Sequence, residues 1–128
     1  MYNENILNIF KNPSNVGVLQ GHNAQGTTTN EATHEIIRIY LLVQNGNVVE
    51  SKFKAFGGVS CIALCSTACE IIKGKSIDKI ENIDVLDFAR VLGQLPDDSG
   101  QVIAQIRQTL SIAVADYYKR LAKEQNSK

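Results

Sequence analysis

A strand, a glycine corner and a helix follow one another directly between Phe53 and Ser76, and this succession constrains the fold more than any other part of the chain. The strand pattern begins at Val48 and alternates as the residues of a half-buried sheet do. One face is expected to carry Val49, Ser51, Phe53 and Ala55, and the other Glu50, Lys52 and Lys54. Because the first of these faces is largely apolar, helices are expected to cover it.

The segment after the Gly57-Gly58 corner predicts one of these covering helices. Ser60 is the expected N-cap, because its hydroxyl oxygen can accept a hydrogen bond from the first turn. The helix is expected to end near Lys73, with Gly74 in the left-handed conformation that often follows a helix. The helix carries three cysteines at intervals of four residues, Cys61, Cys65 and Cys69, which therefore share one face.

The remaining patterns complete an α+β order. A short helix is expected from Glu4 to Phe10. A strand is expected from Ile36 to Val43, and Asn45-Gly46 joins it to the strand described above as a tight hairpin. A further helix is expected from Asp84 through Val91. The last and longest helix begins near Ser99, and its apolar stripe, which is expected to dock on the sheet, consists of Val102, Ile106, Leu110, Ala113, Tyr117 and Leu121.

The chain is expected to form a single domain over residues 1–128, with a small antiparallel sheet of about three strands and helices packed on one face. Its 128 residues, of which 44% are hydrophobic, suit one core. The segment from Gly21 to Asn30 is polar and lacks periodicity, so we expect a mobile loop there. Beyond Lys123 the sequence becomes polar, and residues 124–128 are expected to fray.

Charge and cysteine usage exclude several classes of protein. Thirteen basic and thirteen acidic residues balance, so no positive field is available to attract a nucleic-acid backbone. No apolar run approaches the roughly 20 residues that a bilayer requires. The three cysteines are odd in number and close together, unlike the paired framework of a secreted protein. We therefore expect a cytoplasmic protein that binds neither nucleic acid nor membrane.

No enzymatic activity is predicted from the residues. Gly57-Gly58 lacks the further glycines or the lysine of nucleotide-binding loops. Only His22 and His34 are available as imidazole bases, and neither accompanies a recognisable nucleophile elbow.

Three short motifs occur in a particular order along the chain. They are Asn12-Pro13-Ser14-Asn15-Val16-Gly17 after the first helix, Lys73-Gly74-Lys75-Ser76 at the end of the cysteine-bearing helix, and Ala113-Val114-Ala115-Asp116-Tyr117 in the last helix. Together with the glycine corner they resemble the scaffolds of iron-sulfur cluster assembly, the IscU and NifU N-terminal family, over about Asn3 to Arg120. The resemblance implies the α+β fold of the SufE/NifU type, a role in iron-sulfur cluster assembly, and a cysteine desulfurase as partner.

The resemblance also marks the positions at which family members hold the cluster. Three cysteines of the family correspond here to Thr33, Gly58 and Val102, while Gln101 replaces a histidine and Glu35 replaces an aspartate. Threonine, glycine and valine offer no soft ligand for iron. The chain is therefore predicted to be an accessory or degenerate scaffold that cannot hold a 2Fe-2S cluster by the usual cysteines.

Two alternatives stay open. In the first, His34, Glu35 and Cys61 bind zinc or iron, because imidazole, carboxylate and thiolate suit both metals. Cys61 and Cys69 are eight residues apart, or roughly 12 Å along a helix, so the three cysteines cannot share one ion, and they are expected to be small core residues. The second alternative is an interaction module that binds no metal.

The segment before the last helix bears on a chaperone partner. Family members of the bacterial and mitochondrial type carry Leu-Pro-Pro-Val-Lys here, which a specialised Hsp70 chaperone recognises. The corresponding residues of this chain are Leu95-Pro96-Asp97-Asp98-Ser99, in which two acids and a serine replace apolar and cationic groups. We therefore do not expect delivery by that chaperone.

Overall fold

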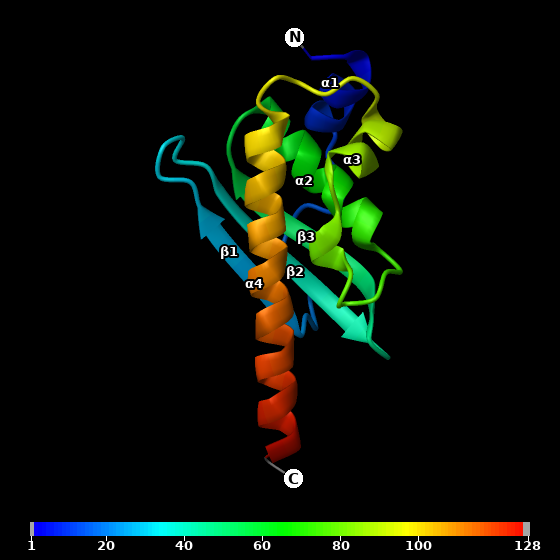
Figure 1. Ribbon diagram of the computed structural model, residues 1–128, viewed down its shortest axis with the longest axis vertical. Helices are drawn as coiled ribbons and strands as arrows, with labels where there is room; N and C mark the ends of the chain where they lie inside the picture. The colour runs from blue at the N-terminus through cyan, green and yellow to red at the C-terminus, as the bar shows by residue number, and fades with distance from the viewer. Residues whose placement is uncertain (1, 127–128) are drawn as a thin grey trace.

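The computed structural model describes residues 2–126. Its elements, in chain order, are α1 (Glu4–Lys11), β1 (Ala24–Thr29), β2 (Ile36–Gln44), β3 (Asn47–Phe56), α2 (Val59–Ile72), the 3-10 helix η1 (Ile80–Asn82), α3 (Val85–Leu92) and α4 (Ser99–Asn126). The strands form one antiparallel sheet in the order β1-β2-β3. Figure 1 shows α4 crossing the sheet and extending past it, with α2 next to it. The predicted α+β fold with a small antiparallel sheet and a long last helix is confirmed.

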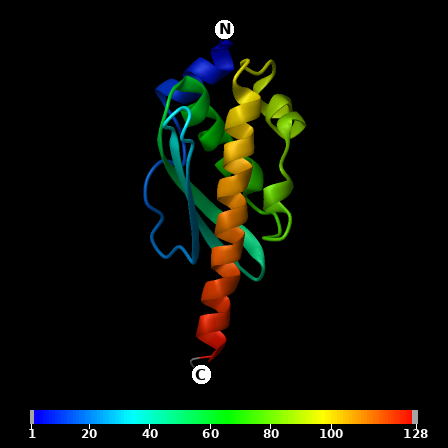
Figure 2. The same cartoon turned by 60° about the vertical axis from the view of Figure 1, so that its left-hand side comes forward.

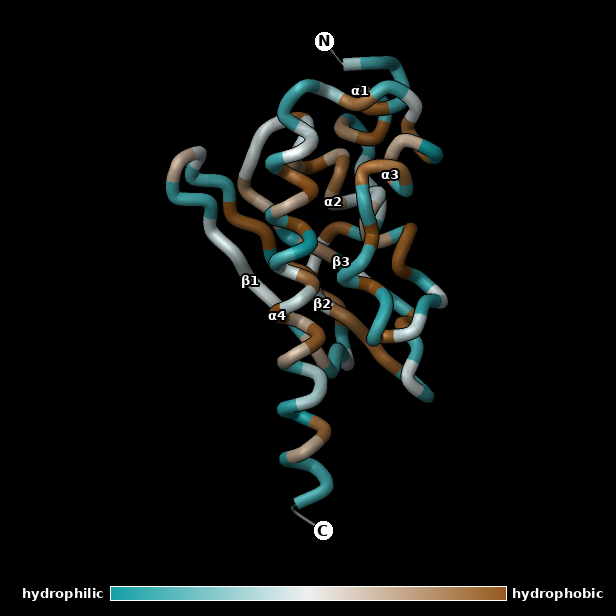
Figure 3. The backbone as a smooth tube through the Cα atoms, viewed as in Figure 1, coloured by the Kyte–Doolittle hydropathy of each residue, from teal (hydrophilic) through white to brown (hydrophobic). Residues whose placement is uncertain are grey.

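The core lies between one face of the sheet and the helices α2 and α4. The opposite face is partly covered by the segment that leads from α1 into β1, drawn in blue in Figure 2. The largest fully buried side chains include Ile37, Ile39 and Leu41 on β2, Phe53 on β3, Leu64 and Ile72 on α2, and Ile106 and Leu110 on α4. Hydrophobic segments accordingly gather around α2 and β2 in Figure 3, whereas the far end of α4 is mostly hydrophilic.

The β2–β3 hairpin follows the prediction at its turn but not along its whole length. Asn45-Gly46 takes the positive φ angles expected of the turn, +53° and +78°. The pairing register then shifts between Leu42 and Val43, which is a β-bulge. As a result Val48 is fully buried and Val49 is 37% exposed, so the predicted inward position of Val49 is wrong, while that of Phe53 is right.

The starts of α2 and α3 are capped in different ways. The side chain of Asp84 accepts a hydrogen bond from the main-chain nitrogen of Asp87. In return, the carboxylate of Asp87 accepts a hydrogen bond from the main-chain nitrogen of Asp84. The predicted N-cap of α2 is wrong, because Gly58 occupies that position without a side-chain bond, while Ser60 lies inside the first turn. Gly74 has the expected left-handed φ, +85°.

The segment from Gly21 to Asn30 is not a mobile loop, because Ala24–Thr29 forms the edge strand β1. This strand packs on α4 through its main chain. A Cβ atom placed on Gly26 would lie 2.3 Å from the carbonyl oxygen of Thr109 and 2.8 Å from the amide nitrogen of Ala113. The loop was predicted because the segment lacks alternating apolar residues. The strand instead packs closely on α4 through its main chain, which requires a small residue at position 26.

Buried polar groups add a second set of contacts between β1 and its neighbours. The hydroxyl groups of Thr28 and Thr109 lie 2.7 Å apart, and the amide of Gln105 donates to the Thr28 hydroxyl at 3.2 Å. Before the strand begins, Asn23 exchanges two hydrogen bonds of 2.8 Å with the main chain of Val43 on β2. These bonds satisfy the polar side chains that made the segment resemble a loop.

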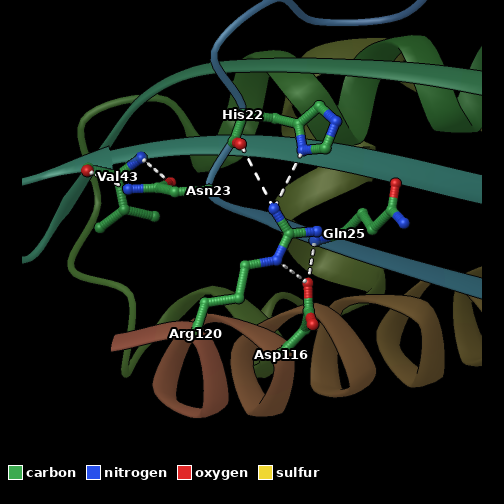
Figure 4. Close-up of polar contacts among 6 residues, drawn as sticks. All are labelled: His22, Asn23, Gln25, Val43, Asp116 and Arg120. Atoms are coloured by element: carbon green, nitrogen blue, oxygen red, sulfur yellow. Dashed lines mark hydrogen bonds and ion pairs between the residues drawn. The ribbon is translucent and has the colours of Figure 1, made fainter. Parts of the chain in front are cut away.

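A polar cluster fastens the start of β1 to the outer half of α4 (Figure 4). The carboxylate of Asp116 accepts a hydrogen bond from the main-chain nitrogen of Gln25 at 2.9 Å and pairs with the Arg120 guanidinium at 3.0 Å. Arg120 in turn donates to the carbonyl oxygen of His22 at 3.4 Å. One main-chain N–H of the edge strand β1 is therefore satisfied by a side chain of α4.

The last helix differs from expectation at its end. Glu124 to Asn126 are helical, and residues 127 and 128 of the predicted frayed tail lie outside the described residues. The predicted stripe is buried through Ala113, while Tyr117 and Leu121 are half-buried. In residues 2–126, no helix is long and apolar enough to cross a membrane.

Candidate functional site

Three segments meet at a surface pocket, which we call the corner pocket. They are the β1–β2 loop, the glycine corner between β3 and α2, and the start of α4. Its lining residues are Thr33, His34, Glu35, Phe56, Gly57, Gly58, Asp98 and Gln101. The structure thus brings Thr33, Glu35, Gly58 and Gln101 to one place, as expected from the ligand positions. Val102 follows Gln101 but is 3% exposed and belongs to the core.

Glu35 connects the loop with the glycine corner. Its carboxylate accepts a hydrogen bond from the main-chain nitrogen of Gly58 and another from the hydroxyl of Thr33, both at 3.4 Å. Its carbonyl oxygen accepts a bond of 3.1 Å from the side chain of Gln105 on α4. Glu35 therefore holds together all three segments that form the pocket.

The turn before β2 presents Thr33 and His34. The side-chain oxygen of Asn30 accepts hydrogen bonds from the main-chain nitrogens of Ala32 and Thr33, at 3.0 and 3.2 Å. His34 closes the turn with a φ of +64° and donates its main-chain N–H to the Asn30 carbonyl at 2.7 Å. Histidine is among the non-glycine residues that adopt a positive φ most often, and the hydrogen bonds of the turn hold His34 in this conformation with its side chain exposed.

The two glycines of the corner have different steric requirements. A Cβ on Gly57 would lie 2.7 Å from the sulfur of Cys61 and 2.9 Å from a carboxylate oxygen of Glu35. A Cβ on Gly58 would meet nothing within 4 Å, and its φ of −83° suits any residue. The side chains of Cys61 and Glu35 therefore leave room only for glycine at position 57, whereas position 58 would accept a side chain, including that of cysteine.

Asp98 and Phe56 are members of the site that sequence reasoning did not find. Asp98 accepts a hydrogen bond of 2.6 Å from the hydroxyl of Ser60, which is 2% exposed. This bond ties the segment before α4 to the first turn of α2, and the serine near the start of α2 was the available signal. Phe56, the last residue of β3, lines the pocket with 64% of its surface exposed.

Sequence comparison places the chain in a family. Residues 1–124 match the model described as the NifU-like N terminal domain. The chain belongs to the NifU-like N-terminal domain family. It is 31% identical over 123 residues to the iron-sulfur cluster assembly scaffold protein IscU 1 of Archaeoglobus fulgidus, covering 96% of this chain and 80% of the relative. It is 36% identical over 118 residues to the scaffold protein IscU of Aquifex aeolicus, covering 91% and 75%.

Solved structures agree with the fold of this NifU-like chain. FiSufU of Fervidobacterium islandicum superposes with a TM-score of 0.68 at 21% identity, over 88% of this chain and 96% of that one. The N-terminal NifU-like protein of Brucella abortus gives a TM-score of 0.63 at 18% identity, over 94% of both chains. The recognition of the family from its short motifs is confirmed.

The cysteines of this NifU-like chain lie in the core, and none of them lines the corner pocket. Cys61, Cys65 and Cys69 are at most 1% exposed, as expected of core residues. A hydrogen bond with Cys61, together with burial, raises the pKa of the Cys65 thiol well above its ordinary value. Burial raises the pKa of the Cys69 thiol to about 12. Cys65 and Cys69 therefore stay protonated at neutral pH and are poor metal ligands.

The proposed ligand set of His34, Glu35 and Cys61 is only partly assembled. Glu35 and Cys61 both border Gly57, as described above, whereas His34 is exposed at the surface. Within residues 2–126, no three side chains of His, Cys, Asp or Glu are grouped closely enough to hold a metal ion. Metal binding by these residues would require Cys61 to leave its buried position, and it stays a hypothesis.

Proposed function

We propose that this NifU-like protein acts in iron-sulfur cluster assembly as an accessory or degenerate scaffold that does not hold a cluster by the usual cysteines. The role in cluster assembly is supported by family membership and by relatives that are named iron-sulfur cluster scaffolds. Although one relative, from Drosophila melanogaster, is named an assembly enzyme, the role proposed here is not catalytic.

The composition of the corner pocket carries the degenerate part of the proposal. The ligand positions that converge there are occupied by Thr33, Gly58 and Gln101, and Val102 beside them is buried. The iron of an iron-sulfur cluster is bound by thiolates. The hydroxyl of threonine, the hydrogen atom of glycine and the amide of glutamine are poor replacements for these ligands. The residues present do not fit a cluster, so the cluster would be the cargo of another chain.

Cluster reconstitution tests this proposal. Protein purified without oxygen is incubated with ferrous iron, cysteine and a cysteine desulfurase, and then iron, acid-labile sulfide and visible absorption are measured. We expect no stoichiometric cluster on the wild-type chain. A stable coloured cluster on the wild type would contradict the proposal.

A gain-of-function variant sharpens the test. Thr33→Cys, Gly58→Cys and Gln101→Cys are combined, because all three positions line the corner pocket and Gly58 has room for the new side chain. We expect this variant to retain iron and sulfide. The matched control places serine at the same three positions, because serine resembles cysteine in size but is not a soft ligand.

The proposed partner is a cysteine desulfurase, and an Hsp70 chaperone is not proposed. Asp97 and Asp98 place two acids where the family peptide is apolar, Ser99 stands where it is cationic, and Asp98 is occupied by its bond to Ser60. A pull-down with purified desulfurase and purified chaperone separates these expectations. If the chain binds neither the desulfurase nor the chaperone, and also binds no metal, the result would favour the remaining alternative, an interaction module that binds no metal.

A second candidate function is zinc or iron binding by His34, Glu35 and Cys61. It is favoured by the approach of the Glu35 carboxylate and the Cys61 thiol to the same side of Gly57. Titration of the metal-free protein with zinc is expected to show stoichiometric uptake that His34→Ala and Cys61→Ser abolish. If the wild-type protein takes up no zinc or iron, this candidate is wrong.

A further inference from the structure

The outer face of the sheet, opposite α2 and α4, carries an uncovered group of apolar and cationic side chains. Along β2 and β3 the residues that alternate with the buried ones are paired across the strands. Ile36 pairs with Phe56, Arg38 with Lys54, and Tyr40 with Lys52. We call the surface formed by Ile36, Arg38, Lys52, Lys54 and Phe56 the outer patch.

Within residues 2–126, one end of this face is covered by the chain and the other end is open. Tyr40 is 4% exposed, because the segment before β1 lies over it and the ring of His22 stands 5.0 Å from its ring. At the other end, Phe56 is 64% and Ile36 41% exposed. A shallow groove is lined there by Ile36, Arg38, Lys54, Ala55 and Phe56. Two large apolar side chains are therefore left in solvent beside an open groove.

The cations of the outer patch have no acidic partner within residues 2–126. The ion pairs there involve Lys73, Arg90 and Arg120, and none includes Arg38, Lys52 or Lys54. The Arg38 guanidinium is instead oriented by a bond of 2.9 Å to the hydroxyl of Thr27. Because Arg38 and Lys54 stand directly opposite each other, their like charges disfavour the folded sheet. An anionic group bound at the patch would relieve this repulsion.

We propose that the outer patch binds an acidic segment of a partner protein that also carries an aromatic or large aliphatic side chain. Lys54 and Phe56 are two residues apart on one strand, or roughly 7 Å, so an extended segment with the same spacing of an acid and an apolar residue matches them. Phe56 also lines the corner pocket, and the bound segment therefore lies beside that site. The inference does not depend on the proposed role in cluster assembly.

The charge distribution favours an acidic protein over other occupants. The chain has thirteen basic and thirteen acidic residues, and a patch of three cations beside exposed apolar groups is small for a nucleic-acid backbone. A second copy placed symmetrically on the same patch would bring cations against cations. A protein segment that combines acids with an apolar anchor satisfies both halves of the patch.

A synthetic peptide tests the proposal. A short fluorescent peptide in which Asp and Glu alternate with Phe and Leu is titrated with the full chain, and its polarisation is measured at low and high salt. We expect saturable binding that weakens with salt, and affinity about 10-fold lower for Lys54→Glu and for Phe56→Ser. Matched controls are Lys119→Glu on α4, where the lysine is also exposed, and Leu86→Ser on α3, where the leucine is 63% exposed. These controls should bind as the wild type does.

Several results would overturn the proposal. One is equal affinity of the wild type and the two patch variants for the acidic peptide. Another is equal binding of a peptide in which lysines replace the acids. Displacement of the peptide by duplex DNA or by anionic lipid vesicles, or a dimer of the wild type that Lys54→Glu dissociates, would assign the patch to a different occupant. All variants are exposed substitutions, and circular dichroism before the titration verifies that they fold.

Discussion

Replacing Gly26 by alanine should destabilise the protein strongly, although only one methyl group is added. Its Cβ would lie 2.3 Å from the Thr109 carbonyl oxygen, whereas ordinary contacts begin at 3.4 Å, so β1 and α4 must separate by about 1 Å. Overpacking of this kind costs about 1–3 kcal/mol. The same shift strains the buried bond between Thr28 and Thr109, for a further cost of about 1–3 kcal/mol.

One smaller term acts in the opposite direction. Alanine restricts the unfolded chain more than glycine does, which favours the folded state by about 0.4–1 kcal/mol. The expected net loss for Gly26→Ala is therefore about 1–5.5 kcal/mol of the free energy of unfolding, which is a large part of the roughly 5–15 kcal/mol typical of a domain.

Urea unfolding followed by circular dichroism measures this loss as a lower midpoint at an unchanged slope. The matched control is Gly100→Ala on α4, where a Cβ meets nothing within 4 Å. Because alanine favours helix, this variant should be as stable as the wild type or more stable by up to about 1 kcal/mol. If Gly26→Ala stays within about 0.5 kcal/mol of the wild type, β1 does not pack on α4 as described.

Two further predictions concern buried polar groups. A double-mutant cycle with Ser60→Ala and Asp98→Ala should give a coupling of about 1–2 kcal/mol in urea unfolding, because the bond between them is charge-assisted and partly buried; additive effects would show that it contributes nothing. Since burial raises the pKa of Cys69 from 9.0 to about 12, the folded state favours the neutral thiol. The contribution of the Cys69 thiol to the free energy of unfolding is complete below pH 9 and is lost as the pH rises toward 12. The free energy of unfolding of Cys69→Ala should therefore fall less between pH 9 and pH 12 than that of the wild type. Equal pH profiles of the two proteins would refute this.

The elements with strong local signals were predictable from the sequence. The positive φ angles of Asn45-Gly46, the cap at Asp84 and the left-handed Gly74 depend on the residue and its immediate neighbours. The edge strand β1 was not predictable in this way. Its stability depends on Gly26 and Thr28 meeting α4 from about 80 residues away, which no local pattern in a polar segment reveals.

The location of the candidate site was predictable, whereas its polar framework was not. The resemblance identified positions 33, 35, 58 and 101, and these do line one pocket. The bond between Ser60 and Asp98 joins a residue that was predicted to cap a helix to a segment that was considered only as a chaperone-binding motif. The register shift between Leu42 and Val43 was equally hidden, because the alternating sequence pattern does not show that Val49 is left unpaired.

The contacts that shape the corner pocket use no sulfur ligand. Glu35 holds the corner and α4, Asn30 forms the turn that presents Thr33, and Asp98 anchors the segment before α4. Since Gly58 has free space around it, the backbone places no demand on the chemistry at that position. The residue at position 58 can therefore change without disturbing the contacts that form the pocket, because Glu35 is bonded there by the main-chain nitrogen and not by a side chain.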